Sequence, residues 1–197
     1  MRRIIKNQDS LIIKEKLIYN STKDNSRLAK LLLLEQKGFC AYTEHYIGFD
    51  DANDIEHFNP NLKDKPNDNY YNWYKVKHLP NQRKSKNWLE PILMPYSEGF
   101  ENRVIYLDGE YFAKPSDIEA NNLIILLDLN NPIRVLNRKN YIKRRKESII
   151  DRKLETKNDI RNYFQLKINS EIDAIRYIRA IESEFEIEIW SLISQKN

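Results

Sequence analysis

Apolar residues recur at three- and four-residue spacing in several parts of the chain, which is the pattern of helices that bury one face. The first of these segments is residues 24–37, in which Asp24 to Ser26 offer helix caps and after which Gly38 marks the stop. The later helical segments have the same spacing, contain no Pro- or Gly-rich linker, and cover residues 117–128, about 133–164 and 170–194. The sequence therefore predicts helices before and after a middle region of different pattern.

The middle region alternates apolar and polar residues, as strands do. Strands are expected at residues 54–58 and 74–79, and the loop between them is rich in Pro and Asn. A short helix is expected at residues 81–87. The predicted order is therefore strand, loop, strand, helix.

Two further hairpins flank this unit. The aromatic-rich stretch FCAYTEHYIGF, residues 39–49, predicts a short one, and residues 103–114 predict a stronger one because an Asp-Gly pair at their centre fits a type I′ turn. The predicted fold class is α+β, with a small strand-strand-helix core, an added β-hairpin, flanking helices and a helical carboxy-terminal region. Residues 1–130 are expected to form the core domain with its amino-terminal helix. Residues 131–197 are expected to form a helical annex, either separate from that domain or continuous with it.

Composition places the chain among ordinary globular proteins. Its 197 residues are 41% hydrophobic, and no stretch approaches the run of about 20 apolar residues that spans a bilayer. Residues 1–16 are interrupted by polar positions before a signal-peptide hydrophobic region can form. A cytoplasmic protein without a membrane partner is therefore expected. The single cysteine, Cys40, excludes an internal disulfide and a cysteine-rich zinc cage.

Positive charge is concentrated in the second half of the chain, although the net charge is only +4. Between Arg134 and Lys157 there are ten Lys or Arg residues and three acids, including the run from Lys143 to Lys146. Such a stripe suits a nucleic-acid backbone, because each neutralised phosphate releases counterions. A solvated helix face explains the same run equally well.

The end of the first predicted strand carries two groups suited to catalysis. Glu56 offers a hard carboxylate ligand, and His57 offers an imidazole that accepts a proton near neutral pH. Asn81, in the short helix, adds an amide oxygen suited to Mg²⁺, and Asn72 can fix the loop or the imidazole. Lys84, one turn after Asn81, is expected to approach a phosphate.

These residue types suit metal-assisted hydrolysis of a phosphodiester. Glu56 and Asn81 would hold Mg²⁺ or Mn²⁺, and His57 would remove a proton from the attacking water. Strict alternation along a strand sends Glu56 and His57 to opposite faces. A shared site therefore requires the strand to end or twist at this point.

Glu56, His57 and Pro60 form the run EHxxP, which is followed by Asn72 and then by Asn81-x-x-Lys84. This series resembles the ββα-metal motif of HNH endonucleases. The resemblance implies that the acid and the last Asn bind the metal, that the His is the general base, and that the middle Asn supports the site. On this basis the expected catalytic residues are His57 and Asn72, and the expected metal ligands are Glu56 and Asn81.

The resemblance extends over roughly residues 25–146 to the PtuB-like HNH subunits of Septu anti-phage systems, through the stretches LLEQKGFCAYTE, IEHFNP and LLDLNNPIRVLNR. It implies a DNA-cleaving effector that works with an ATPase subunit in a bacterial defence complex. The residues expected to bind nucleic acid, with DNA favoured over RNA, are Arg83, Lys84, Lys86, Lys143, Arg144 and Arg145.

The structural zinc of this family is not expected here. Where the relatives carry two CxxC pairs, the sequence reads Cys40, Thr43, Lys77 and Pro80, so only one ligand remains. The first hairpin is then expected to be held by aromatic packing. If zinc is nevertheless bound, His45 is the first candidate for a replacement ligand.

A non-catalytic nucleic-acid-binding or scaffolding subunit is the alternative function, although the presence of all four motif residues favours an enzyme. His45 and His78 are interpreted as structural or exposed, and Asp54 is a candidate outer-sphere or additional metal group because it shares a strand face with Glu56. The apolar stripe of residues 170–194 is expected to bury against the preceding helix or to dock the ATPase partner.

Overall fold

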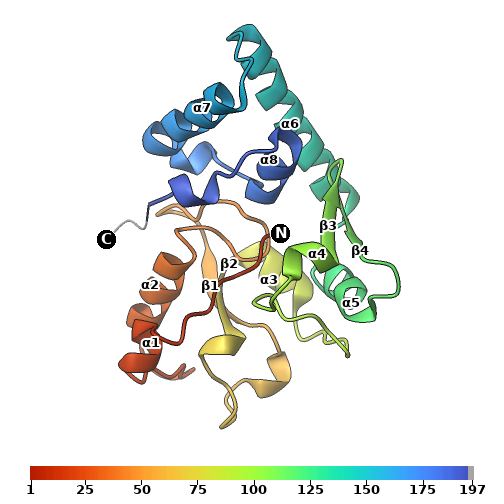
Figure 1. Cartoon of the computed structure of the whole chain (residues 1–197). Helices are drawn as coiled ribbons and strands as arrows, with labels where there is room; N and C mark the ends of the chain where they lie inside the picture. The colour runs from red at the N-terminus through yellow and green to blue at the C-terminus, as the bar shows by residue number, and fades with distance from the viewer. Residues whose placement is uncertain (195–197) are drawn as a thin grey trace.

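A two-stranded antiparallel sheet followed by a helix forms the centre of the molecule (Figure 1). In the computed structural model, which describes residues 1–194, strand β1 (Asn53–His57) pairs with strand β2 (Trp73–Lys77). Helix α3 (His78–Lys84) begins directly after β2 and packs on both strands. The predicted order of strand, loop, strand and helix is confirmed, with the helix beginning at His78 rather than at Asn81.

The second sheet is the hairpin of β3 (Val104–Leu107) and β4 (Glu110–Ala113), as predicted. Its turn has φ of 41° at Asp108 and 81° at Gly109, and a type I′ turn needs positive φ at both positions. A side chain at Gly109 would also crowd the hairpin, because a Cβ there would lie 2.7 Å from Cγ of Lys139. The fold class is α+β, with two small antiparallel hairpins.

The aromatic stretch after α2 (Ser26–Glu35) forms a tight turn and not a regular hairpin. A single antiparallel bridge joins Phe39 to Tyr46, and the backbone N–H of Cys40 donates to the carbonyl of His45 at 2.9 Å. The rings of Phe39 and Tyr46 pack edge to face with centroids 5.5 Å apart. This turn lies beside β2, because the N–H of Ala41 donates to a carbonyl of that strand at 3.1 Å.

Helices surround the two sheets. The other α-helices are α1 (Leu11–Lys14), α2 (Ser26–Glu35), α4 (Phe100–Arg103), α5 (Ile118–Leu126), α6 (Pro132–Asp151), α7 (Lys157–Ser170) and α8 (Ile178–Phe185). Short 3₁₀ turns cover Pro60–Leu62, Tyr70–Asn72, Ile172–Ala174 and Trp190–Leu192. Within residues 1–194, none of these helices has both the length and the apolar character needed to cross a membrane.

The helices predicted at 24–37 and 117–128 are confirmed, but the two later helix predictions are wrong in their extent. The segment at about 133–164 is divided between α6 and α7, because Thr156 and Asp159 form a reciprocal capping box that starts a new helix. The segment 170–194 is divided as well, because the left-handed backbone at Tyr177, with φ of 57°, precedes α8.

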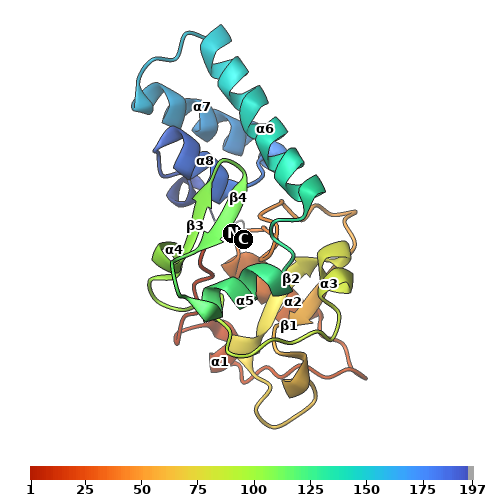
Figure 2. The same cartoon turned by 90° about the vertical axis from the view of Figure 1, so that its right-hand side faces the viewer.

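One apolar core runs through most of the molecule and includes residues on both sides of position 130. Helices α6, α7 and α8 lie together at one end, and α8 packs against α6 and β3 (Figure 2). The isoleucines of the carboxy-terminal stripe, namely Ile175, Ile178, Ile181 and Ile189, are at most 1% exposed. The docking role expected of this stripe is therefore corrected, because its side chains are already buried within the chain.

A smaller apolar cluster holds the central sheet from the other side. Leu28, Leu31 and Leu32 share one face of α2 and pack with Ile12 of α1 and Trp73 of β2. Since α3 packs on the same two strands, the β1–β2 hairpin is held between helices. This arrangement fixes the strand that carries the predicted site residues.

Candidate active site

The side chains of β1 alternate between two sides, as a strand requires. Asp54 and Glu56 contact residues of α3, whereas His57 contacts the loop that connects β1 to β2. Although β1 ends at His57, no hydrogen bond or ion pair joins the side chains of Glu56, His57 and Asn81 to one another in the described part of the chain. The structure therefore separates the predicted base from the predicted metal ligands.

Glu56 forms a buried ion pair with the helix that follows β2. Nζ of Lys84 lies 2.7 Å from Oε1 of Glu56, and the hydroxyl of Tyr42 donates to the same oxygen at 3.3 Å. Burial raises the pKa of Glu56, and the ammonium of Lys84 opposes that rise. The side chain of Lys84 is only 1% exposed. The expectation that Lys84 contacts a phosphate is corrected, because its charge is already neutralised inside the protein.

Asp54 holds the start of α3. Its Oδ2 accepts a hydrogen bond from Nδ2 of Asn81 at 2.9 Å and lies 2.8 Å from Nδ1 of His78. The charge of Asp54 contributes to the raised pKa of Glu56, so the two carboxyl groups are near each other on one side of β1. Asp54, and not Glu56, is therefore the carboxylate that is hydrogen-bonded to Asn81.

His57 is buried on the opposite side of β1. Its Nε2 lies 3.0 Å from Oδ2 of Asp68, but without the alignment of a hydrogen bond. The ring of Tyr19 packs edge to face on the imidazole, with centroids 4.4 Å apart. Burial lowers the pKa of His57, and the carboxylate of Asp68 opposes this effect. The imidazole is therefore neutral at pH 7 and able to accept a proton.

Asn72 fixes the loop around His57. Its Oδ1 accepts the backbone N–H of Asn59 at 2.7 Å, and its Nδ2 donates to the carbonyl of Asn59 at 3.1 Å and to Oδ1 of Asp68 at 2.9 Å. Nε1 of Trp73 donates to the same oxygen at 2.8 Å. Asn72 and Trp73 thereby hold the carboxylate that lies next to His57.

Three residues of this arrangement were not predicted from the sequence: Tyr19, Tyr42 and Asp68. Asp68 belongs to the polar stretch NPNLKDKPNDN, in which no periodicity distinguishes one carboxylate from its neighbours. Its position shortly before Asn72 is the only sequence signal for it. The two tyrosines reach the site from segments far away in the chain, so local pattern contains no sign of them.

The oxygen donors beside α3 fit a hard divalent cation in their chemistry. Mg²⁺ is usually bound by one or two carboxylates together with water and substrate phosphates, and Asp54, Glu56 and Asn81 supply two carboxylates and an amide. Within residues 1–194 no three His, Cys, Asp or Glu side chains converge in a way that could hold a metal ion. In the described arrangement Lys84 provides the cation that Glu56 contacts.

The positions of the missing zinc ligands do not fit a tetrahedral zinc site. The thiol of Cys40 accepts the backbone N–H of Lys77 at 3.3 Å, so these two positions do lie side by side. The other two positions carry Thr43 and Pro80, whose side chains are not zinc ligands. The turn is held by the packing of Phe39 and its neighbours instead.

The predicted nucleic-acid-binding residues do not form one continuous surface. Arg83 and Lys86 are exposed on and just after α3. Lys143 and Arg144 are exposed on α6, but Arg145 donates to the hydroxyl of a buried tyrosine at 3.0 Å and packs on a second aromatic ring. The basic run on α6 is therefore partly a structural feature.

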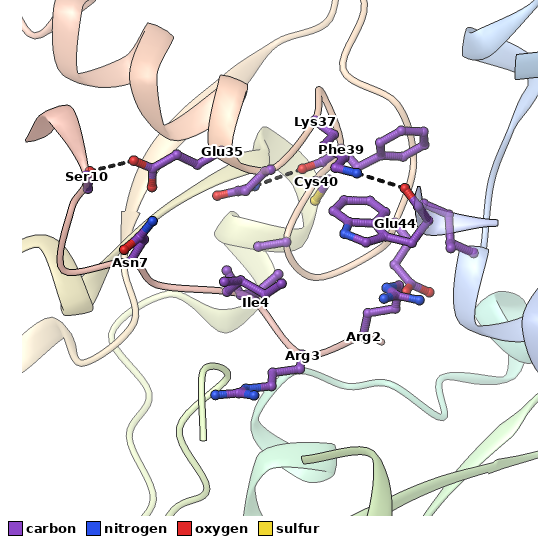
Figure 3. Close-up of a pocket in the computed structure, with 15 residues that line it drawn as sticks. Arg2, Arg3, Ile4, Asn7, Ser10, Glu35, Lys37, Phe39, Cys40 and Glu44 are labelled. Atoms are coloured by element: carbon purple, nitrogen blue, oxygen red, sulfur yellow. Dashed lines mark hydrogen bonds between the residues drawn. The ribbon is translucent and has the colours of Figure 1, made fainter. Parts of the chain in front are cut away.

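A separate cavity of about 210 Å³ lies between the amino-terminal segment and residues 35–44 (Figure 3). Ser10 donates to Glu35 at its edge, and Arg2 forms an ion pair with Glu182. Because these groups are paired within the chain, we assign the cavity no role in the candidate site.

Comparison of the chain with protein-family models, with curated proteins and with solved structures finds no match.

Proposed function

We propose that the protein is a metal-dependent endonuclease of the HNH type that hydrolyses phosphodiester bonds in nucleic acid, with DNA as the expected substrate. One observation carries the proposal. The antiparallel pair β1–β2 is followed directly by α3, and this unit presents Asp54, Glu56 and Asn81 between strand and helix, with His57 at the end of β1.

The chain's own residues supply the parts that such a reaction needs. Asp54, Glu56 and Asn81 would hold Mg²⁺ or Mn²⁺, which when bound would neutralise the scissile phosphate and stabilise the leaving oxygen. His57 is neutral at pH 7 because burial lowers its pKa, so it can take a proton from an attacking water. Asp68 would stabilise the imidazolium that results, and Asn72 holds Asp68 in place.

The described arrangement corresponds, under this proposal, to a closed form of the site. Glu56 is paired with Lys84, and His57 is covered by Tyr19. Access of a phosphodiester requires Lys84 to leave Glu56 and the imidazole to turn toward the side of β1 that carries the carboxylates. A partner that binds only the open form would therefore activate the enzyme, which agrees with the expected ATPase subunit of a defence complex.

The proposal is tested by cleavage of plasmid DNA and of RNA with Mg²⁺ or Mn²⁺, by the chain alone and together with its ATPase partner. His57→Ala should reduce cleavage by roughly 10²-fold or more, because the general base is lost. Asn81→Ala should also reduce cleavage, and a higher Mn²⁺ concentration should partly restore it. Asn87→Ala is the matched control, since Asn87 is exposed just beyond α3. Undiminished cleavage by His57→Ala would remove the assignment.

A second function is favoured by one specific observation. The buried ion pair of Glu56 with Lys84 and the buried imidazole of His57 are also what a non-catalytic nucleic-acid-binding subunit would show. The two functions differ in outcome. A scaffold would bind nucleic acid but would produce no cleavage with either metal, with or without the partner.

A further inference from the structure

A cavity of about 480 Å³ lies between the start of α3, the turn of residues 42–45 and the first turns of α6. Its volume is within the range of about 300–1,000 Å³ typical of small-ligand pockets. The polar residues that border it and matter for its chemistry are Thr43, His45, Lys77, Arg83, Arg134 and Arg138. It borders the candidate active site, because Tyr42 and His78 line it, but neither the Glu56–Lys84 pair nor His57 does.

Positive charge dominates the wall of this cavity. Its lining contains four Lys or Arg residues and a single acid, Asp51. Nζ of Lys77 lies 2.9 Å from Asp51, so one cation is compensated. Arg138 is buried, and it donates to two backbone carbonyls at 2.6 Å each, which orient its guanidinium but do not neutralise it. An excess of positive charge therefore remains at the cavity.

The remaining two arginines have unused hydrogen-bonding capacity. Arg134 uses Nη1 for two backbone carbonyls at 2.6 and 3.1 Å. Arg83 is exposed, and its side chain forms no hydrogen bond or ion pair with any other residue in the range 1–194. Burial lowers the pKa of Arg134, the charge of Asp128 opposes this effect, and the nearby charges of Arg83 and Arg138 lower the pKa further. An anion between these groups would relieve their mutual repulsion.

Two polar atoms at the cavity have no partner. Oγ1 of Thr43 and Nε2 of His45 are buried and form no hydrogen bond within the described residues. An unpaired buried polar group costs about 1–3 kcal/mol, so such groups are rare unless something else satisfies them. Burial together with the positive charge of Arg176 and Lys77 lowers the pKa of His45 to about 4. The imidazole is therefore neutral at pH 7, with one N–H able to donate.

We propose that this cavity binds a phosphate-bearing ligand of about the size of a nucleotide. The arginines and the turn supply donors for phosphate oxygens, and bidentate arginine pairs are well suited to that group. Another part of the wall is apolar or aromatic, with Leu79, Tyr111 and Tyr177 among its members. A base or a sugar can pack against that part.

A free nucleotide and the terminal phosphate of a nucleic-acid strand share this chemistry. The cavity begins at α3, which is also the helix of the proposed catalytic unit, so either source is sterically reasonable. The inference does not require the proposed nuclease activity. Binding can be measured in the presence of a chelator, where metal-dependent cleavage does not occur.

The test uses isothermal titration calorimetry on the full chain, with EDTA present. The ligands are inorganic phosphate, AMP, adenosine, and a short single-stranded oligonucleotide with and without a 5′-phosphate. AMP should bind, and adenosine should bind at least about tenfold more weakly, because it lacks the charged group. If only the phosphorylated oligonucleotide binds well, the site is assigned to strand ends. If AMP binds equally well, the site is assigned to nucleotides.

Variants connect the binding to the cavity. Arg83→Ala should weaken AMP or phosphorylated-strand binding by about tenfold or more, the value of one charge-assisted hydrogen bond. Lys139→Ala is the matched control, because Lys139 is an exposed cation on α6 that does not line the cavity. It should change affinity by less than about twofold. Thr43→Val should weaken binding without lowering the midpoint of urea unfolding, because it removes an unpaired hydroxyl and keeps the shape.

Three results would overturn the inference. The first is the absence of binding by phosphate, AMP and the phosphorylated strand alike. The second is equal affinity for AMP and adenosine. The third is an equal loss of affinity in Arg83→Ala and Lys139→Ala, which would indicate a diffuse surface charge effect.

Discussion

The buried ion pair between Glu56 and Lys84 leads to a prediction that can be worked out in detail. Nζ of Lys84 lies 2.7 Å from Oε1 of Glu56, and the two side chains are 1% and 8% exposed. Lys84→Met keeps a long apolar side chain but leaves the carboxylate without its cation. Glu56→Gln removes the negative charge instead, and the double variant removes both charges.

The expected magnitude follows from the burial of both groups. Removing one partner of a buried ion pair costs about 3–5 kcal/mol, because the remaining charge is left without compensation. Replacing both partners by uncharged groups of similar volume is often close to neutral. We therefore expect each single variant to lower the free energy of unfolding at pH 7 by about 3 kcal/mol, and the double variant to recover most of that loss.

The cost of Lys84→Met should also depend on pH. The pKa of Glu56 is raised from 4.5 by burial and held down by Lys84, so the variant raises it further. A carboxyl group whose pKa is higher in the folded state takes up a proton on folding. Its contribution to stability therefore falls as the pH rises from 4.5 toward the folded-state pKa. The variant should be closer to the wild type at pH 5 than at pH 7.

Urea unfolding followed by circular dichroism at pH 5 and pH 7 measures these differences. Lys146→Met is the matched control, because Lys146 pairs with Glu184 at 2.7 Å while its side chain is 49% exposed. That variant should cost less than about 1 kcal/mol. The reasoning is refuted if Lys84→Met and Glu56→Gln each cost less than about 1 kcal/mol at pH 7 and their effects add in the double variant.

Three further predictions concern the fold. Gly109→Ala should lower the free energy of unfolding by about 1–2 kcal/mol, because φ at this residue is 81°. Gly48→Ala is the control and should change it little, since the backbone at Gly48 is not left-handed. Equal effects of the two variants would contradict the turn assignment. Ile181→Ala should lower the free energy of unfolding by about 2–5 kcal/mol, and Ile150→Ala, at an exposed position, by about 0.5 kcal/mol or less. A small effect of Ile181→Ala would mean that α8 does not belong to the core. The pKa of His45 is lowered to about 4 in the folded state from 6.5, so stability is lost as the pH falls through this window. Urea unfolding at pH 4.5 and 7 should show that His45→Gln removes up to about 3 kcal/mol of that loss, and an unchanged pH profile would count against the buried imidazole.

The elements that the sequence predicted correctly are those with strong local signals. The β3–β4 hairpin has an Asp-Gly pair at a turn that needs two positive φ values, and α2 has a leucine stripe on one face. The carboxy-terminal region was predicted incorrectly because apolar spacing of three and four does not by itself define one long helix. Short helices and 3₁₀ turns bury the same isoleucines, and only tertiary packing decides between these structures.

The candidate site shows the same division between local and tertiary information. Glu56 and His57 were expected to share one site through an end or twist of the strand, but the alternation of β1 places them on opposite sides. Lys84 was expected to approach a phosphate, but it is buried. A lysine is rarely buried unless it has a partner, and here that partner is on another element. Asp68 comes from a loop whose polar residues have no regular spacing, so its place beside His57 could not be derived.

Under the proposed function, the closed form limits how the enzyme can be activated. Opening the site breaks a buried ion pair, which costs about 3–5 kcal/mol. A ligand that binds only the open form contributes about 2.7 kcal/mol at 100 times its dissociation constant and about 4.1 kcal/mol at 1,000 times. Mg²⁺ dehydrates reluctantly and is usually bound by one or two carboxylates together with substrate phosphates, so we expect nucleic acid or a protein partner to supply part of this free energy. Full cleavage by the chain alone at millimolar Mg²⁺ would therefore show that the Glu56–Lys84 pair is not an obstacle. Cleavage that requires both partner and metal in the wild type, but only metal in Lys84→Met, would identify the pair as the element that keeps the nuclease closed.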